Sequence, residues 1–183
     1  EEENKILYSY SDLASGTGKL GWCYGDQAII YTLLRYDETF NSREAKSKAY
    51  ELVEQTALKP IEETGVKYYA KYGYHDIRIC HGTSSVAYMY LKMYQITQDM
   101  RLMDLARKWI DLTLNDLNIY LPQLDKITDL EKSNISVDPS WQIDTSMGFL
   151  NGLSGVGLVL ITFLDPKLSD WDKLLLLDRS GRD

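Results

Sequence analysis

Apolar residues recur three or four positions apart along most of the chain, which is the spacing of one face of an α-helix. From Gln27 to Tyr36 the sequence reads QAIIYTLLRY, apolar on nearly every side, and this predicts a buried helix. From 41 to 58 the apolar residues keep to one face, which predicts a half-exposed helix. Asn41 and Glu44 have the spacing of a capping box at its start.

The same pair of segments occurs twice more. The apolar segment 84–97 is followed by the amphipathic segment 99–117, and the apolar segment 153–164 by the sequence WDKLLLL. Each apolar segment follows a short glycine turn, and the turns begin at residues 23, 80 and 150, so they lie 57 and then 70 residues apart. A long-period repeat of helix hairpins predicts an all-α fold, either a solenoid or a closed ring. The polar segment 120–140 predicts a surface loop, for which a lid is one role.

Composition excludes several classes of protein. The chain has 183 residues, is 44% hydrophobic and carries a net charge of −7, so it can bury one domain core but lacks the basic face that nucleic acids or anionic membranes require. It contains no apolar run of the roughly 18 residues that span a bilayer, and residues 1–20 do not resemble a signal peptide. Two cysteines are too few for a disulfide scaffold. We therefore expect a cytoplasmic protein.

Cys23 and the pair Cys80–His81 carry the most informative chemistry. They lie at equivalent places in the first two turns, and the third turn, at Leu150, has no such residue. In a ring of hairpins equivalent turns face the same end, so the three side chains are expected to converge. Two thiols and an imidazole suit zinc and leave a fourth tetrahedral position open. Taken alone, the pattern also fits two buried apolar cysteines, a disulfide, or a histidine that caps a helix.

The sequences WCYG, CHG, NGLSGVGL and WDKLLLL, in this order, resemble the lanthionine synthetase C-like (LanC-like) cyclases. The resemblance implies an α/α toroid of inner and outer helices, with one zinc ion held by Cys23, Cys80 and His81. It implies an enzyme that adds a cysteine thiol of a dehydrated precursor peptide to a dehydroalanine or dehydrobutyrine, which forms a thioether ring. A dehydratase and a transporter are the further partners that the resemblance suggests.

Two features depart from the family pattern. The family's turns usually continue to a second glycine, and here Ala28 and Ser85 stand at that position in the first two turns, while Gly155 keeps it in the third. Family members are also about twice as long. Residues 1–183 are therefore expected to form the C-terminal part of a toroid domain, with an incomplete ring and without the acid–base residues of the N-terminal half. We expect the isolated chain to bind zinc and to be inactive.

The addition reaction ends with an enolate that needs a proton. Tyr24, beside Cys23, and His75, five residues before Cys80, are the candidate catalytic acids. Each has a structural alternative, since Tyr24 can pack on Trp22 and His75 can be a loop residue. Two other functions stay open: a zinc-bearing module that binds glutathione or a peptide without catalysis, and a helical scaffold without metal.

Overall fold

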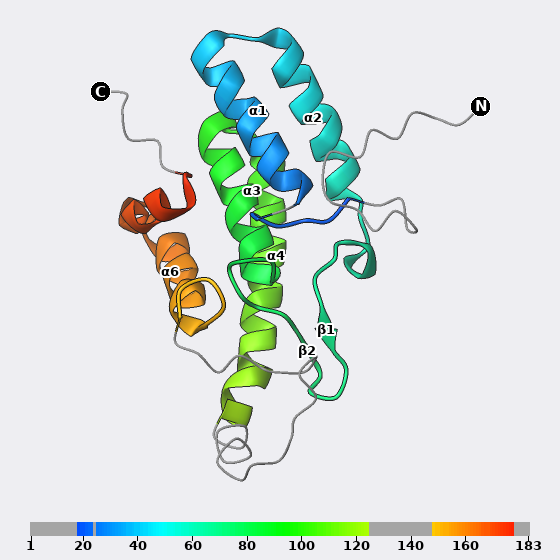
Figure 1. Ribbon diagram of the computed structural model, residues 1–183, viewed down its shortest axis with the longest axis vertical. Helices are drawn as coiled ribbons and strands as arrows, with labels where there is room; N and C mark the ends of the chain where they lie inside the picture. The colour runs from blue at the N-terminus through cyan, green and yellow to red at the C-terminus, as the bar shows by residue number, and fades with distance from the viewer. Residues whose placement is uncertain (1–17, 24, 125–147, 178–183) are drawn as a thin grey trace, which may run out of the picture.

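The computed structural model describes residues 18–23, 25–124 and 148–177 (Figure 1). Two helix hairpins and a further helix lie side by side, which confirms the predicted all-α fold and gives a fragment of an α/α toroid. None of the helices in these ranges has the length and apolarity that crossing a membrane requires. The helices are α1 (Asp26–Phe40), α2 (Arg43–Ala57), α3 (Thr83–Thr97), α4 (Met100–Tyr120) and α6 (Leu153–Leu164).

Helix α3 lies at the centre of the molecule. It packs against α1, α4 and α6, and eleven of its fifteen residues are buried. The segment from Val86 to Met93 therefore carries apolar residues on every side, as a helix surrounded by other helices must. The prediction of a buried inner helix after the second glycine turn is confirmed.

Helices α2 and α4 are the outer limbs of the two hairpins. Each buries one face against its inner helix and exposes the other, as the amphipathic pattern predicted. The predicted capping box at Asn41 is wrong. Asn41 is instead the left-handed residue that ends α1, with a φ of 53°, and the next residue, Ser42, caps α2 by accepting a bond from the Ala45 N–H. Both residues favour caps, so sequence alone did not decide between them.

A short β-hairpin separates α2 from α3. Strands β1 (Tyr68–Tyr69) and β2 (Tyr74–His75) pair antiparallel, and Gly73 between them has a φ of 80°. A 3₁₀ turn, η1 (Ile61–Glu63), precedes them. Strands of two residues are too short to show a period, so no pattern in the sequence indicated this hairpin.

The second limb of the third hairpin differs from the prediction. After α6 the chain forms the 3₁₀ turns η4 (Pro166–Leu168) and η5 (Asp170–Leu175) instead of an amphipathic α-helix. Buried polar contacts fix this segment, because Asp172 of η5 accepts a bond from Tyr88 at 2.8 Å and pairs with Lys92 at 2.7 Å. These contacts replace the helical packing that the run of leucines suggested. The predicted loop at 120–140 lies outside the described residues from 125 onward; up to Gln123 it continues α4 as a 3₁₀ turn, η2 (Leu121–Gln123).

Candidate metal centre

The three predicted ligands lie together. Cys23 belongs to the turn before α1, and Cys80 and His81 to the turn before α3. The two Sγ atoms are 3.4 Å apart, and the ligand atoms of all three residues lie within 4.8 Å of one another. The two cysteines are 57 residues apart in the sequence. Both are free thiols, so their closeness is not due to a disulfide. The convergence inferred from the repeat is therefore what the structure shows.

This arrangement fits a tetrahedral metal ion. Zinc binds thiolate sulfur at about 2.3 Å, so two sulfurs of a tetrahedral site are about 3.8 Å apart, close to the separation seen here. The cluster provides three donors, which leaves one tetrahedral corner for another ligand. Cys23 is exposed and Cys80 half-buried, so this corner can be reached from solvent. The donor set and its spacing are those of a site that can hold a metal ion.

Close approach of the backbone explains the turn glycines. Gly25 and Gly82 have φ values of −98° and −93°, which any residue can adopt, whereas Gly21, earlier in the first turn, has a φ of 123°. A Cβ atom at Gly25 would collide with the backbone of Leu20 and Gly21, and one at Gly82 with the backbone of Asp76. The glycines let the chain fold tightly back on itself just before each inner helix, which places the cysteines at the helix ends.

Ser85 joins the first turn to the second. Its hydroxyl accepts the Trp22 N–H at 2.9 Å and donates to the Cys80 carbonyl at 3.5 Å. The serine that replaces the second glycine of the family pattern therefore makes a bridge between the two ligand-bearing turns. The third turn contributes as well, because the Leu150 carbonyl accepts the Cys80 N–H at 3.2 Å. The third turn, which has no candidate ligand of its own, therefore supports the turn that carries Cys80.

Asp76 orients the histidine of the cluster. Its carboxylate is 1% exposed and lies 3.2 Å from Nε2 of His81. Because a carboxylate only accepts hydrogen bonds, Nε2 of the neutral imidazole carries the proton and the buried Nδ1 keeps a lone pair for a metal. Arg78 donates to the same carboxylate through Nε at 2.8 Å and Nη2 at 2.6 Å. The Asp76 pKa is lowered well below its usual range, although burial alone would raise it, because His81 and Arg78 bind the charged form.

The thiol of Cys23 needs a cation to ionise. Although Cys23 is exposed as a residue, neighbouring atoms partly desolvate its sulfur; this desolvation, followed by the hydrogen bond and charge of Cys80, raises the pKa of Cys23 to about 12. Without a nearby positive charge, the Cys23 thiol beside Cys80 therefore stays protonated at neutral pH. A divalent cation reverses this balance, since a thiol that coordinates it is deprotonated.

The two predicted catalytic residues have different outcomes. Tyr24 lies outside the described residues. His75 is in β2, and its Nδ1 lies 3.2 Å from the Asp116 carboxylate of α4, with the Tyr68 ring packed 4.8 Å from the imidazole. His75 is not one of the three residues of the candidate metal centre, and the carboxylate that it contacts belongs to α4. A catalytic role for either residue stays a prediction.

From the sequence, Asp76 and Arg78 received no role, and Ser85 was marked only as a departure from the family pattern. A metal-binding histidine usually has a carboxylate or carbonyl on its second nitrogen. The acidic residue Asp76, close before Cys80–His81, was the available signal for that partner. Nothing in the sequence indicated that Ser85 bridges two turns, because its partners belong to distant segments.

The fold and the cluster together define an all-α protein with a candidate Cys₂His metal centre at one end of its inner helices. A family model described as "Lanthionine synthetase C-like protein" matches residues 1–176, and the chain belongs to this family. The resemblance seen in the sequence is thereby confirmed.

A curated relative from Danio rerio carries the name "Glutathione S-transferase LANCL1". It is 29% identical over 94 residues, which are 51% of this chain and 20% of the relative. The match therefore spans about a fifth of that protein's length.

Proposed function

We propose that this chain holds one zinc ion at Cys23, Cys80 and His81 and activates a cysteine thiol of a dehydrated precursor peptide for thioether ring formation. The proposal depends mainly on one observation: the three donor atoms lie within 4.8 Å of one another. A tetrahedral ion bound by these three donors has a fourth position free for a substrate. Family membership supports the same reaction class. The substrate thiol is assigned to the open corner.

The donor set suits nucleophilic chemistry. Zinc supplies the positive charge that makes a coordinated thiol a thiolate at neutral pH, where a free cysteine with a pKa of about 8.5 is mostly protonated. Cys23 and Cys80 as thiolates and His81 as a neutral imidazole balance the two positive charges of the ion, so the substrate sulfur stays electron-rich. Asp76 holds the imidazole in the tautomer that this requires.

The bond changes of the proposed reaction balance without a further reagent. The substrate sulfur bonds to the β-carbon of a dehydroalanine or dehydrobutyrine, and the electron pair of the C=C bond moves toward the α-carbon and its carbonyl. The α-carbon then takes one proton, which replaces the proton that the thiol lost. Tyr24 and His75 are the proposed sources of that proton. The product has the mass of the reactant.

A second function is favoured by the relative named as a glutathione S-transferase. In this alternative the same cluster activates the thiol of glutathione, and a separate electrophile takes the place of the dehydrated residue. Both functions begin with activation of a thiol at the cluster. They differ in the substrates, which are a cysteine and a dehydrated residue of one peptide in the first function, and glutathione and a separate electrophile in the second.

The test uses a peptide with one dehydroalanine and one free cysteine, incubated with and without glutathione. The enzyme is the zinc-loaded chain, alone and joined to the N-terminal half of a family member, because the chain alone is expected to be inactive. Ring formation removes the free thiol at unchanged mass, whereas glutathione transfer adds the mass of glutathione to the peptide. The matched control is Cys80→Ala, which removes a sulfur of the cluster. Thiol loss at an equal rate with this variant contradicts the proposal. Glutathione addition without ring closure selects the alternative.

A further inference from the structure

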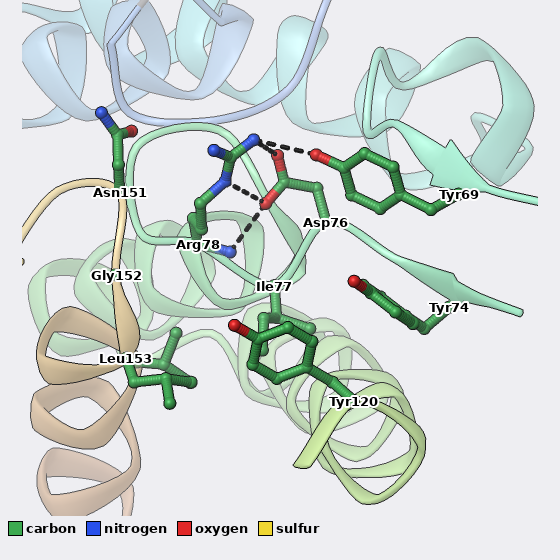
Figure 2. Close-up of a pocket in the computed structure, with 10 residues that line it drawn as sticks. Tyr69, Tyr74, Asp76, Ile77, Arg78, Tyr120, Asn151, Gly152 and Leu153 are labelled. Atoms are coloured by element: carbon green, nitrogen blue, oxygen red, sulfur yellow. Dashed lines mark hydrogen bonds and ion pairs between the residues drawn. The ribbon is translucent and has the colours of Figure 1, made fainter. Parts of the chain in front are cut away.

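A pocket of about 340 Å³, part of which is open to solvent, lies between the β-hairpin, the end of α4 and the start of α6 (Figure 2). The side chains of Tyr69, Tyr74 and Tyr120 point their hydroxyl ends toward the same space (Figure 2). The lining residues are Tyr69, Tyr74, Asp76, Ile77, Arg78, Tyr120, Asn151, Gly152, Leu153 and Val156.

The pocket adjoins the candidate metal centre through two shared elements. Asp76 contributes to its wall and also contacts Nε2 of His81. The third glycine turn contributes Asn151 and Gly152 to the wall, and the preceding Leu150 carbonyl binds the Cys80 N–H. Asp76 and the third glycine turn therefore border both the pocket and the candidate metal centre.

Tyr74 presents a buried hydroxyl to this space. The residue is 2% exposed, and its hydroxyl makes no hydrogen bond within the part of the chain that the structure describes. Burial raises the pKa of Tyr74 above its usual range, so the group stays a neutral donor. The hydroxyl of Tyr69, by comparison, accepts from Nη2 of Arg78 at 3.0 Å. Buried hydroxyls normally have a partner, so Tyr74 indicates a ligand that accepts a hydrogen bond here.

The charges of the pocket indicate a neutral ligand. Arg78 and Asp76 are its charged lining residues, and they neutralise each other through two hydrogen bonds of 2.8 and 2.6 Å. Aromatic and aliphatic side chains make up most of the remaining wall. Such a pocket favours an apolar side chain and disfavours a free carboxylate, which would lose its hydration without gaining a counter-charge.

We propose that this pocket binds an apolar side chain of the residue next to the reacting cysteine of a peptide substrate, and that the Tyr74 hydroxyl donates to that residue's carbonyl oxygen. The inference rests on the proposed thiol-activating function. It makes the pocket a specificity site that distinguishes a peptide from glutathione, whose neighbouring groups end in carboxylates.

The test measures thiol binding to the cobalt-loaded chain, in which a thiolate that joins the metal changes the visible absorption. The probes are N-acetylated, C-amidated dipeptides of cysteine with leucine and of cysteine with glycine, each in both residue orders. We expect leucine to bind at least about tenfold more tightly than glycine in one order, as burial of a leucine side chain provides. Tyr74→Phe should weaken the tighter leucine probe about three- to tenfold, the range for one hydrogen bond. Tyr90→Phe is the control, because it removes another buried hydroxyl that does not line the pocket.

The outcomes separate the pocket from the metal centre. If every probe changes the spectrum but leucine and glycine bind within twofold in both orders, the metal function stands and the pocket proposal is overturned. Equal leucine affinity of Tyr74→Phe and the unmodified chain overturns it as well. If no thiol changes the spectrum, the thiol-activating function is wrong and the pocket proposal fails with it.

Discussion

Replacing Asp76 with asparagine tests whether the histidine tautomer controls metal binding. The carboxylate accepts from Arg78 and lies 3.2 Å from Nε2 of His81 while only 1% exposed. An asparagine has one oxygen to accept from either Arg78 or Nε2 of His81, and its NH₂ group then faces the other of these two groups. If it faces His81, the imidazole moves its proton to Nδ1, the nitrogen needed for the metal.

Two magnitudes follow from these contacts. Loss of a carboxylate partner on a metal-binding histidine lowers metal affinity about 10- to 100-fold. The lost charge-assisted hydrogen bonds lower the free energy of unfolding by about 1.5–3 kcal/mol. Zinc competition against a coloured chelator measures the first quantity, and urea unfolding of the metal-free protein measures the second.

Asp116→Asn is the matched control for this experiment. Asp116 contacts Nδ1 of His75 at 3.2 Å, the same distance as in the Asp76 pair, but His75 is not part of the candidate metal centre. We expect this variant to keep its metal affinity within twofold. A folded Asp76→Asn protein with unchanged affinity, or an equal loss in both variants, would refute the tautomer argument.

Three further predictions concern the turns and the core. Ser85→Ala removes the acceptor of the Trp22 N–H and should weaken metal binding about three- to tenfold by loosening one turn from the other, which zinc competition detects; unchanged affinity would contradict the bridge. Because the pKa of Cys23 is raised to about 12, its thiol is protonated from about pH 7 to 9, and iodoacetamide should alkylate it slowly over this range in the metal-free protein. An alkylation rate of Cys23 that rises with a midpoint near about pH 8.5 would contradict this. Lys92→Met leaves the Asp172 carboxylate buried without its cation and should cost about 3–5 kcal/mol in urea unfolding, and adding Asp172→Asn should recover at least half of the loss; equal instability of the single and double variants would show that the ion pair is not the cause.

Local patterns predicted the inner helices and the ligand set. The apolar residues of α3 and the equivalent positions of Cys23 and Cys80 in their turns are properties of the sequence itself, and the structure agrees with both. The candidate ligands could be found because they are rare residue types at repeated positions.

The remaining features depend on contacts between distant segments. Ser85 meets Trp22 across 63 residues, and Lys92 meets Asp172 across 80, so no local pattern reports either contact. The contacts of Asp172 with Lys92 and Tyr88 fix η5, where the sequence suggested a helix. Asn41 shows the other limit, because a residue suited to either kind of helix cap is decided by the backbone around it.

The central claim is that Cys23, Cys80 and His81 hold one zinc ion with an open corner. Metal analysis and zinc-edge X-ray absorption of the purified chain test it most directly. The expected result is one zinc per chain with two sulfur neighbours at about 2.3 Å, and loss of that zinc in Cys80→Ala. A chain without stoichiometric zinc, or a Cys80→Ala variant that retains full zinc, would contradict the account.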